Sequence, residues 1–406
     1  MIRTVVAAAL LLSTATPALA ATLKVEAGEG AQERLQEALI LAKPGDTVEL
    51  EAGRFVLTDG LSLDVPGVTV KGAGTEVTVL DFTRQQGAGE GLLVTSDDVT
   101  LRDFAVENAK GDAIKSKGAD RIVYHRVRAE WTGGPKETNG AYGIYPVESD
   151  GVLIDGVVAR GASDAGIYVG QSRNITVRHS VADGNVAGIE IENSRNALVT
   201  GNYLTRNTGG ILVFDLPNLP VMGGGDVVVT DNLVVGNDTP NFAPKGNIVA
   251  SVRRGTGIMI MANDRVIVED NTLAANPTSD IMVIAYPLKY DDARYNPYPR
   301  RVTIGFNNVN GSSGRDPQLP GAQALLAAFG RPLGGALPTV MWDGIAAPEG
   351  PTLAVHPGLT GWSMNLPRLG ASPEEAKPAL LKSAAPSQAA EDARVGAPAE
   401  LEKRIG

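Results

Sequence analysis

Apolar side chains recur along the chain with a spacing of about 22 residues. An aliphatic residue, usually preceded by glycine, marks the same point of each repeat at Leu92, Ile114, Ile144, Ile167, Ile189, Ile211, Ile258 and Ile281. The gaps between these anchors are 22, 30, 23, 22, 22, 47 and 23 residues, so the longer gaps indicate loops inserted into a regular coil. Repeats of this length are typical of solenoids, in which each coil packs only on its neighbours.

Two further apolar positions complete each repeat. A short strand alternates apolar and polar residues, and its last apolar member is Leu101, Tyr124, Ile154, Val177, Val199, Val229, Val268 or Ile304. Five residues later comes another apolar position, at Val106, Ala129, Ala159, Ala182, Leu204, Val234, Leu273 and Val309. Period-two alternation places one face of a strand inward. Three short strands per coil around a shared core predict an all-β protein, a right-handed parallel β-helix.

Asparagines keep the same register. They follow the second apolar position by three residues at Asn202, Asn232, Asn271 and Asn307, and by eight residues at Asn185, Asn207, Asn237 and Asn276. Turns favour asparagine, and stacked asparagines satisfy one another. We interpret both rows as scaffold.

The ends of the chain depart from the repeat. Residues 21–44 predict an N-terminal cap, because residues 31–43 have helical spacing of apolar residues and Pro44-Gly45 ends the pattern. The β-helix is expected over residues 45–310. Residues 311–370 predict an irregular C-terminal cap with a short helical stretch near residues 322–329. The Ala/Pro-rich residues 371–406 predict a disordered tail.

Residues 1–20 have the pattern of a secretory signal. Arg3 precedes the short apolar run Val5–Leu12, and Ala18-Leu19-Ala20 provides small residues for cleavage after Ala20. The apolar run is too short to span a membrane, and the chain has no cysteine. We therefore expect a periplasmic or secreted protein that folds without disulfides and does not span the membrane.

Charge narrows the choice of partners. The net charge is −10 and no basic run is present, which argues against nucleic acid. An anionic substrate would need a local basic patch or a bridging cation. Asp150, Asp155, Asp164 and Asp183 leave Ca²⁺ open as a cofactor, although their spacing matches no EF-hand loop. No other cofactor is indicated.

The chain resembles the pectin-lyase-like superfamily over residues 23–310. The resemblance rests on the helical segment, on Pro44–Leu50 with Gly53 and Phe55 after it, and on the Gly-Ile and Asn-rich coils. Within the superfamily it is similar to exported bacterial right-handed parallel β-helix repeat proteins. The resemblance implies a lyase, hydrolase or C5-epimerase acting on uronic-acid polysaccharides, and an exported partner similar to c-type cytochromes. The Gly-His-Gly, Arg-x-Pro-x-x-Arg and Asp-Pro-His motifs of the superfamily's enzymes are absent.

The repeat register brings six polar side chains onto one outward face. They stand one and three residues after the aliphatic anchor in four successive coils, within roughly 14 Å: Lys115, Lys117, Tyr145, Tyr168, Glu190 and Glu192. The insertions at residues 131–141, 215–225 and 238–255 flank this face. Together they predict a groove with an aromatic floor that suits sugar rings.

Two chemistries fit this groove. In β-elimination from a uronic acid, Lys115 or Lys117 would neutralise the carboxylate or act as base, and Tyr145 or Tyr168 would protonate the leaving oxygen. In glycoside hydrolysis, Glu190 and Glu192 would be the paired carboxyl groups. A lyase or epimerase is favoured over a hydrolase.

The alternative is a non-catalytic scaffold or binding module that works with the cytochrome-like partner. Charge on the outward face would separate the two, because a lyase for polyanions is expected to show a positive cleft and a scaffold a mixed one.

Overall fold

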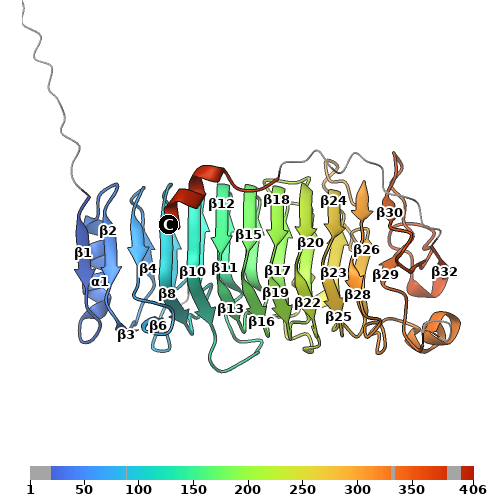
Figure 1. Ribbon diagram of the computed structural model, residues 1–406, viewed down its shortest axis with the longest axis horizontal. Helices are drawn as coiled ribbons and strands as arrows, with labels where there is room; N and C mark the ends of the chain where they lie inside the picture. Colours follow the sequence, from blue (N-terminus) through green and yellow to red (C-terminus); the bar gives the residue numbers. More distant parts are fainter. Residues whose placement is uncertain (1–19, 88, 331–333, 382–394) are drawn as a thin grey trace, which may run out of the picture.

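The strands stack side by side along one axis, so that each coil of the chain adds one layer to a parallel β-helix (Figure 1). The structure is a computed structural model that describes residues 20–87, 89–330, 334–381 and 395–406. The predicted fold class, an all-β right-handed parallel β-helix, is confirmed.

One face of the solenoid is a sheet of 12 strands, which we call sheet B. Its strands pair in parallel, except for the last pair, which is antiparallel. Sheet B consists of β4 (Leu61–Leu63), β7 (Leu92–Val94), β9 (Ile114–Lys117), β11 (Tyr142–Val147), β14 (Ala165–Gly170), β17 (Ala187–Glu192), β20 (Gly209–Phe214), β23 (Thr256–Met261), β26 (Ser279–Ile284), β29 (Val340–Trp342), β31 (Gly361–Ser363) and β32 (Ala379–Leu380).

The other two faces form one sheet of 20 strands, sheet A. They are joined because β8 and β10 run around the corner between them, and β10 pairs with both β12 and β13. Sheet A consists of β1 (Thr22–Val25), β2 (Thr47–Leu50), β3 (Gly53–Val56), β5 (Thr69–Lys71), β6 (Thr78–Asp81), β8 (Thr100–Glu107), β10 (Ile122–Glu130), β12 (Asp150–Asp155), β13 (Val158–Arg160), β15 (Arg173–Arg178), β16 (Val181–Asp183), β18 (Arg195–Thr200), β19 (Tyr203–Thr205), β21 (Gly225–Thr230), β22 (Leu233–Val235), β24 (Asp264–Glu269), β25 (Thr272–Ala274), β27 (Val302–Ile304), β28 (Asn308–Val309) and β30 (Leu353–Val355).

The observed register matches the one expected from the apolar repeat. In sheet B, Ile144 pairs with Ile114 on one side and with Ile167 on the other. The inserted loop does not disturb the stack, because Ile211 pairs with Ile258 across the gap of 47 residues. The anchors lie in one continuous buried core.

Both asparagine rows form hydrogen-bonded ladders inside the turns, as predicted. The Asn207 side chain donates to Oδ1 of Asn237 at 2.9 Å and accepts from Nδ2 of Asn185 at 3.0 Å. In the second row, the Asn232 side chain donates to Oδ1 of Asn271 at 2.9 Å. Each amide also bonds to the backbone, so buried polar groups at the turns are satisfied coil by coil.

The N-terminal end corrects one predicted boundary. Helix α1 (Ala31–Leu41) covers the end of the core with Ala31, Leu35 and Leu39 buried. Ahead of it, β1 already pairs in parallel with β2, so the solenoid begins before the helix and not at residue 45. In β1 only Val25 is buried, so this strand of four residues has too short an apolar pattern to be recognised from the sequence.

The C-terminal region predicted as an irregular cap continues both sheets. Strand β29 pairs with β26 and β31, and β30 pairs with β27. The long loops between these strands hide the spacing of about 22 residues. The short helix α2 (Ala322–Leu325) and the π-helical turn Leu326–Gly330 lie where the helical stretch was expected.

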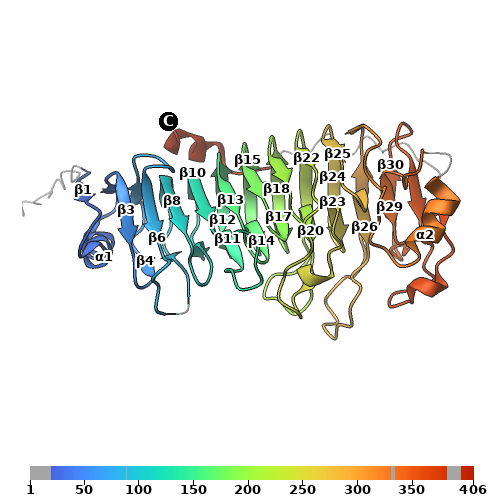
Figure 2. The same cartoon turned by 90° about the horizontal axis from the view of Figure 1, so that it is seen from below.

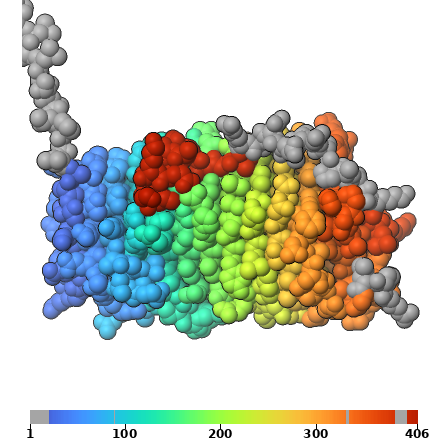
Figure 3. All heavy atoms as spheres, in the orientation of Figure 1, coloured from blue at the N-terminus to red at the C-terminus, as the bar shows by residue number. Residues whose placement is uncertain are grey.

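The last residues are not a free tail. Helix η6 (Ala399–Arg404) lies on the outside of sheet A, where the red segment of Figure 3 crosses coils from the first half of the chain. Leu401 is buried against Val123 and Leu153, and Arg404 donates to Oγ1 of Thr100. The expectation of disorder is therefore corrected for residues 395–406, because these contacts lie far away in sequence and leave no local signal. Residues 371–381 are also placed, and 382–394 lie outside the described residues.

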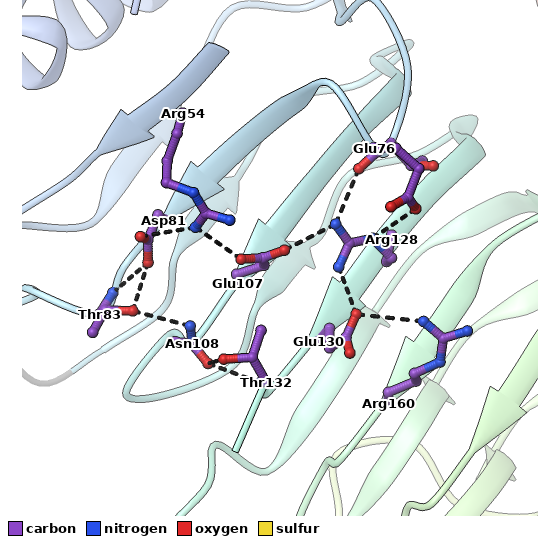
Figure 4. A network of polar contacts seen from close by, with 11 residues as sticks. Arg54, Glu76, Asp81, Thr83, Glu107, Asn108, Arg128, Glu130, Thr132 and Arg160 are labelled. Carbon is purple, nitrogen blue, oxygen red and sulfur yellow. Dashed lines mark hydrogen bonds and ion pairs between the residues drawn. The ribbon is translucent and has the colours of Figure 1, made fainter. Parts of the chain in front are cut away.

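A network of ion pairs runs across the outside of sheet A near the N-terminal end (Figure 4). Arg54 contacts Asp81 and Glu107, each at 2.9 Å. Arg128 contacts Glu107 at 2.9 Å and Glu130 at 2.5 Å. Carboxylates of successive coils pair with these guanidinium groups, so the ion pairs link neighbouring coils. This surface therefore has no excess of positive charge.

The predicted signal segment falls almost wholly on residues 1–19, which lie outside the described residues. Of the helices the structure places, none combines the length and apolar character needed to cross a membrane.

Candidate functional site

The register of sheet B brings the predicted site residues into neighbouring coils. Tyr145 pairs with Lys115, and Tyr168 pairs with Glu190. These side chains point away from the solenoid core, on the surface that we call the outer face of sheet B. The predicted alignment of the six residues is confirmed at the level of backbone pairing, while their exposure differs from the prediction.

Most of the outer face is covered, which corrects the expected open groove. Tyr168 and Glu192 are buried and Glu190 is 0% exposed. Toward the C-terminal end the face turns apolar, and loop residues pack on it in a second hydrophobic cluster, which includes Leu212, Phe214, Met259, Phe242, Val249 and Tyr295. Figure 2 shows the yellow and gold loops of this half extending beyond the strands. Access is left at the N-terminal end of the face, around β9 and β11.

Lys117 lies apart from the other five predicted site residues. Its side chain is exposed, and the nearest acidic group is Glu148, with Nζ and Oε1 separated by 3.9 Å. The structure therefore assigns Lys117 to the rim of the site.

Three tyrosines form the centre of the site. The ring centroids of Tyr142 lie 4.4 Å from Tyr145 and 4.6 Å from Tyr168, and the rings of Tyr145 and Tyr168 are 4.9 Å apart. Tyr142 and Tyr145 are half-buried, whereas Tyr168 is buried and bonds to Glu192. The trio thus passes from the accessible end of the face to its covered part.

Lys115 lies at the accessible end, between two carboxylates and a ring. Its Nζ is 3.0 Å from Oε1 of Glu90, 3.6 Å from Oδ2 of Asp112 and 4.9 Å from the ring centroid of Tyr145. Burial lowers the pKa of Lys115, but the two carboxylates outweigh it and the net pKa is raised. Lys115 therefore stays an ammonium ion at neutral pH.

Burial shifts the pKa values of both Asp112 and Tyr145. Burial raises the pKa of Asp112 to about 6, although Lys115 opposes the shift. Burial also raises the pKa of Tyr145 against the effect of Lys115, so the phenol keeps its proton. Near pH 7 the site pairs a carboxylate that can accept a proton with a phenol that can donate one.

A buried group of carboxyls lies behind the tyrosines. Burial, together with the Glu192 carboxylate, raises the pKa of Asp164 to about 7. Burial likewise raises the pKa of Glu192 to about 7 and that of Glu190 well above its ordinary value. Neither carboxyl oxygen of Glu190 has a hydrogen-bond partner among the described residues. A buried, unpaired carboxylate is strongly disfavoured, so Glu190 is protonated at neutral pH.

Glu90, Asp112 and Tyr142 were not predicted from the sequence, and Asp164 was considered only as a possible calcium ligand. The first three share one signal, because each stands two residues before an aliphatic anchor, at Leu92, Ile114 and Ile144. The predicted site residues, by contrast, all stand after the anchor. Asp164 could not be found in this way, since its environment depends on the covering loop, from which Asn247 donates to Oδ2 at 3.3 Å.

The donor set does not suggest a metal centre. Across the described ranges, no group of three or more His, Cys, Asp or Glu side chains is arranged to hold a metal ion. What the arrangement offers is an aromatic surface, one ammonium group and acid–base groups with pKa values near neutrality.

Comparisons with known proteins agree with the architecture. The profile of the family described as "Right handed beta helix region" matches residues 66–221. No curated protein sequence matches the chain. Among solved structures, the A-module of the mannuronan C-5 epimerase AlgE4 of Azotobacter vinelandii shares 14% identity at a TM-score of 0.53, covering 83% of this chain and 94% of the module.

Two further solved structures are similar at lower scores. An alginate lyase from Paenibacillus sp. str. FPU-7 shares 18% identity at a TM-score of 0.45, covering 72% of this chain and 96% of that one. A polygalacturonase from Erwinia carotovora ssp. carotovora shares 13% identity at a TM-score of 0.42, covering 76% of this chain and 95% of that one. At such identities the likeness concerns the fold. The coil register, the family profile over residues 66–221 and the shared fold show that the chain folds as a right-handed parallel β-helix.

Proposed function

We propose that the protein acts on a polysaccharide by proton transfer at the accessible end of the outer face of sheet B. The observation that carries the proposal is the grouping of Asp112, Lys115 and Tyr145, with Lys115 Nζ 3.6 Å from the Asp112 carboxylate and 4.9 Å from the Tyr145 ring centroid. The half-buried rings of Tyr142 and Tyr145 offer the surface on which a sugar ring can rest.

Each of the three residues has one role in this proposal. Asp112, whose pKa is about 6, is the general base. Tyr145 keeps its proton and is the general acid toward the leaving oxygen. Lys115 keeps its charge and stabilises negative charge on the substrate, which replaces the expectation that it serves as base.

The finer proposal is a uronic-acid lyase or C5-epimerase. Both reactions begin when a base removes the proton at C5, next to the uronic carboxylate, and charge then develops on that carboxylate. A base, an acid and a cation are the groups that such a step requires. The mannuronan C-5 epimerase module with the same fold gives this chemistry a precedent on a β-helix.

The burial of the two glutamates argues against hydrolysis by Glu190 and Glu192. Both are buried, so neither a sugar nor an attacking water reaches them. Burial also raises both pKa values in the same direction, whereas paired hydrolytic carboxyls need values that differ.

A binding module is the second candidate function. Glu90 and Asp112 balance the positive charge of Lys115, so the accessible end of the face is mixed and not strongly positive. Such a face was expected of a non-catalytic module. Export and the cytochrome-like partner remain predictions from the sequence.

The test is a substrate panel. Purified protein is incubated with alginate, pectate and neutral glycans, with and without Ca²⁺, while absorbance reports unsaturated product, NMR reports C5 inversion and a reducing-end assay reports cleavage. Turnover of an acidic glycan that is lost in Tyr145→Phe, but kept in the exposed control Tyr203→Phe, supports the enzyme. Glycan binding that needs Tyr145, without any turnover, supports the binding module. If the protein shows neither turnover nor glycan binding, both candidate functions are contradicted.

A further inference from the structure

A hollow lies away from the site formed by Asp112, Lys115 and Tyr145, which we call the tyrosine site, in the C-terminal half of the solenoid. Its volume is about 840 Å³, and it is formed by the loop that follows β26 and by residues 347–351. The charged and aromatic residues that line it are Tyr290, Arg294, Tyr295, Tyr298, Arg300, Arg301 and Glu349. Three arginines against one glutamate make this lining basic, on a chain whose net charge is −10.

Two of these arginines, Arg294 and Arg301, present their guanidinium groups to solvent while their carboxylate partners are largely covered. The Arg294 side chain is 74% exposed and its partner Asp292 only 13%. The Arg301 side chain is 51% exposed and its partner Asp264 only 9%. Each carboxylate therefore orients its arginine from behind, and what a ligand meets is the cationic side of the pair.

Both guanidinium groups keep unused donors. Arg294 bonds to Asp292 through Nε and Nη2, and Arg301 bonds to Asp264 through the same two nitrogens. Within the described residues, Nη1 of either arginine makes no hydrogen bond. The network around Arg128 in Figure 4 is different, since that side chain is buried among several carboxylates.

Tyrosines supply the apolar part of the lining. Tyr290 is exposed and its ring centroid lies 5.1 Å from that of the buried Tyr295. The Tyr295 hydroxyl donates to the carbonyl of Asp215 at 2.5 Å, which ties the wall of the hollow to the loop that follows β20. The aromatic part of the pocket is thus held in place before any ligand arrives.

We propose that this hollow binds a carboxylated sugar residue of an acidic polysaccharide. Free guanidinium N–H groups recognise planar carboxylates, and aromatic rings take the apolar face of a sugar. The inference rests on the proposed function, because the same glycan chain would run from this pocket to the tyrosine site. The coil of β26 is six strand steps from that of β9, which is roughly 29 Å, so only a long oligosaccharide reaches both.

The experiment compares two arginine variants in the full chain. Binding of a long uronate oligosaccharide, its trisaccharide, a neutral oligosaccharide of equal length and a sulfated one is measured by calorimetry at low and high salt. Arg294→Gln/Arg301→Gln is expected to weaken binding of the long uronate roughly tenfold or more. Arg368→Gln is the matched control, since Arg368 is also exposed and paired with one carboxylate, Glu375. It is expected to leave binding unchanged.

Four outcomes are distinguishable. Loss of long-uronate binding in the double variant, with turnover of the trisaccharide unchanged, supports the pocket. Loss of that binding in a protein that turns over no glycan also supports the pocket while removing the proposed catalysis. Equal binding by the double variant and wild type overturns the pocket, even if turnover is found. Equal loss of the sulfated and the uronate chain overturns the preference for a carboxylate.

Discussion

The Tyr168 hydroxyl donates a hydrogen bond of 2.7 Å to Oε1 of Glu192, one coil further along the solenoid. Both residues project outward from sheet B, and both are buried. The bond therefore lies in a second interior, between the sheet and the loops that cover it. Carboxyls enclosed in this way have raised pKa values.

The stability of the protein is expected to fall as the pH rises from about 5 to about 8. Burial raises the folded-state pKa of Glu192 and Asp164 to about 7, above their unfolded values, so the native state binds more protons in this range. The contribution of these carboxyls to the free energy of unfolding is fully present below their unfolded-state pKa values. It is lost as the pH rises through their folded-state pKa values. Denaturant unfolding is expected to show a decrease of about 3 kcal/mol or more.

Glu192→Gln separates this effect from general pH sensitivity. Glutamine still accepts from Tyr168 and does not titrate, so the slope should flatten between pH 5 and pH 8. Glu148→Gln, which removes a half-exposed carboxyl, serves as the control. An unchanged slope in Glu192→Gln would mean that the enclosed carboxyls do not titrate as described.

Asp112→Asn should remove the base and lower kcat/KM by about 10² to 10⁴. In the wild type, kcat/KM is expected to rise with pH and to reach half of its plateau near pH 6, since the pKa of Asp112 is about 6 and the base must be ionised. The measurement is a pH–rate profile on the glycan found by the panel. Asp231→Asn, at an exposed turn, should change neither rate nor profile. A full rate in Asp112→Asn contradicts the assignment.

Tyr145→Phe should lower kcat by about 10² to 10⁴ with little change in glycan affinity, because only the phenolic proton is lost. Tyr145→Ala should in addition weaken binding, since it removes the ring that packs with Tyr142 and Lys115. Separate measurement of kcat and of the dissociation constant tests this split. Equal kcat in Tyr145→Phe and in the wild type would remove Tyr145 as the acid.

Asn207→Ala should cost about 2 to 4 kcal/mol of unfolding free energy. The substitution breaks the ladder between Asn185 and Asn237 and leaves the carbonyl of Ala182 without its donor. Chemical denaturation measures the loss. Asn310→Ala is the comparison, because among the described residues this exposed side chain bonds only within its own turn. The substitution should change stability by less than about 0.5 kcal/mol.

Leu401→Asp should release the C-terminal segment while the solenoid stays folded. The contact is local, with Leu401 against Val123 and Leu153, and a buried unpaired carboxylate would oppose it. Hydrogen exchange is expected to lose protection at Ala397, whose N–H donates to Oγ1 of Thr176 at 2.9 Å. Lys403→Asp makes a charge change on the exposed side of the same helix and should leave the segment in place.

The repeat in the sequence was sufficient to predict the fold and the register. Apolar anchors at a nearly constant spacing can stack in only one way, since a slip of one residue would turn each inward side chain outward. For this reason Ile211 and Ile258 were aligned correctly across a long insertion. The asparagine ladders followed from the same register. The ends were less predictable, because β1 and β30 stand alone between irregular segments.

The chemistry of the site depended on the tertiary structure. Sequence placed Tyr145, Tyr168, Glu190 and Glu192 on one outward face, but spacing carries no information about where an inserted loop folds back. The loops leave Tyr145 accessible and bury Glu190, and this difference separates a candidate acid from a carboxyl that no substrate reaches. The local alternation of apolar and polar residues thus determined which way each side chain projects from the sheet. Residues distant in sequence determined whether a substrate can reach it and, through desolvation, its pKa.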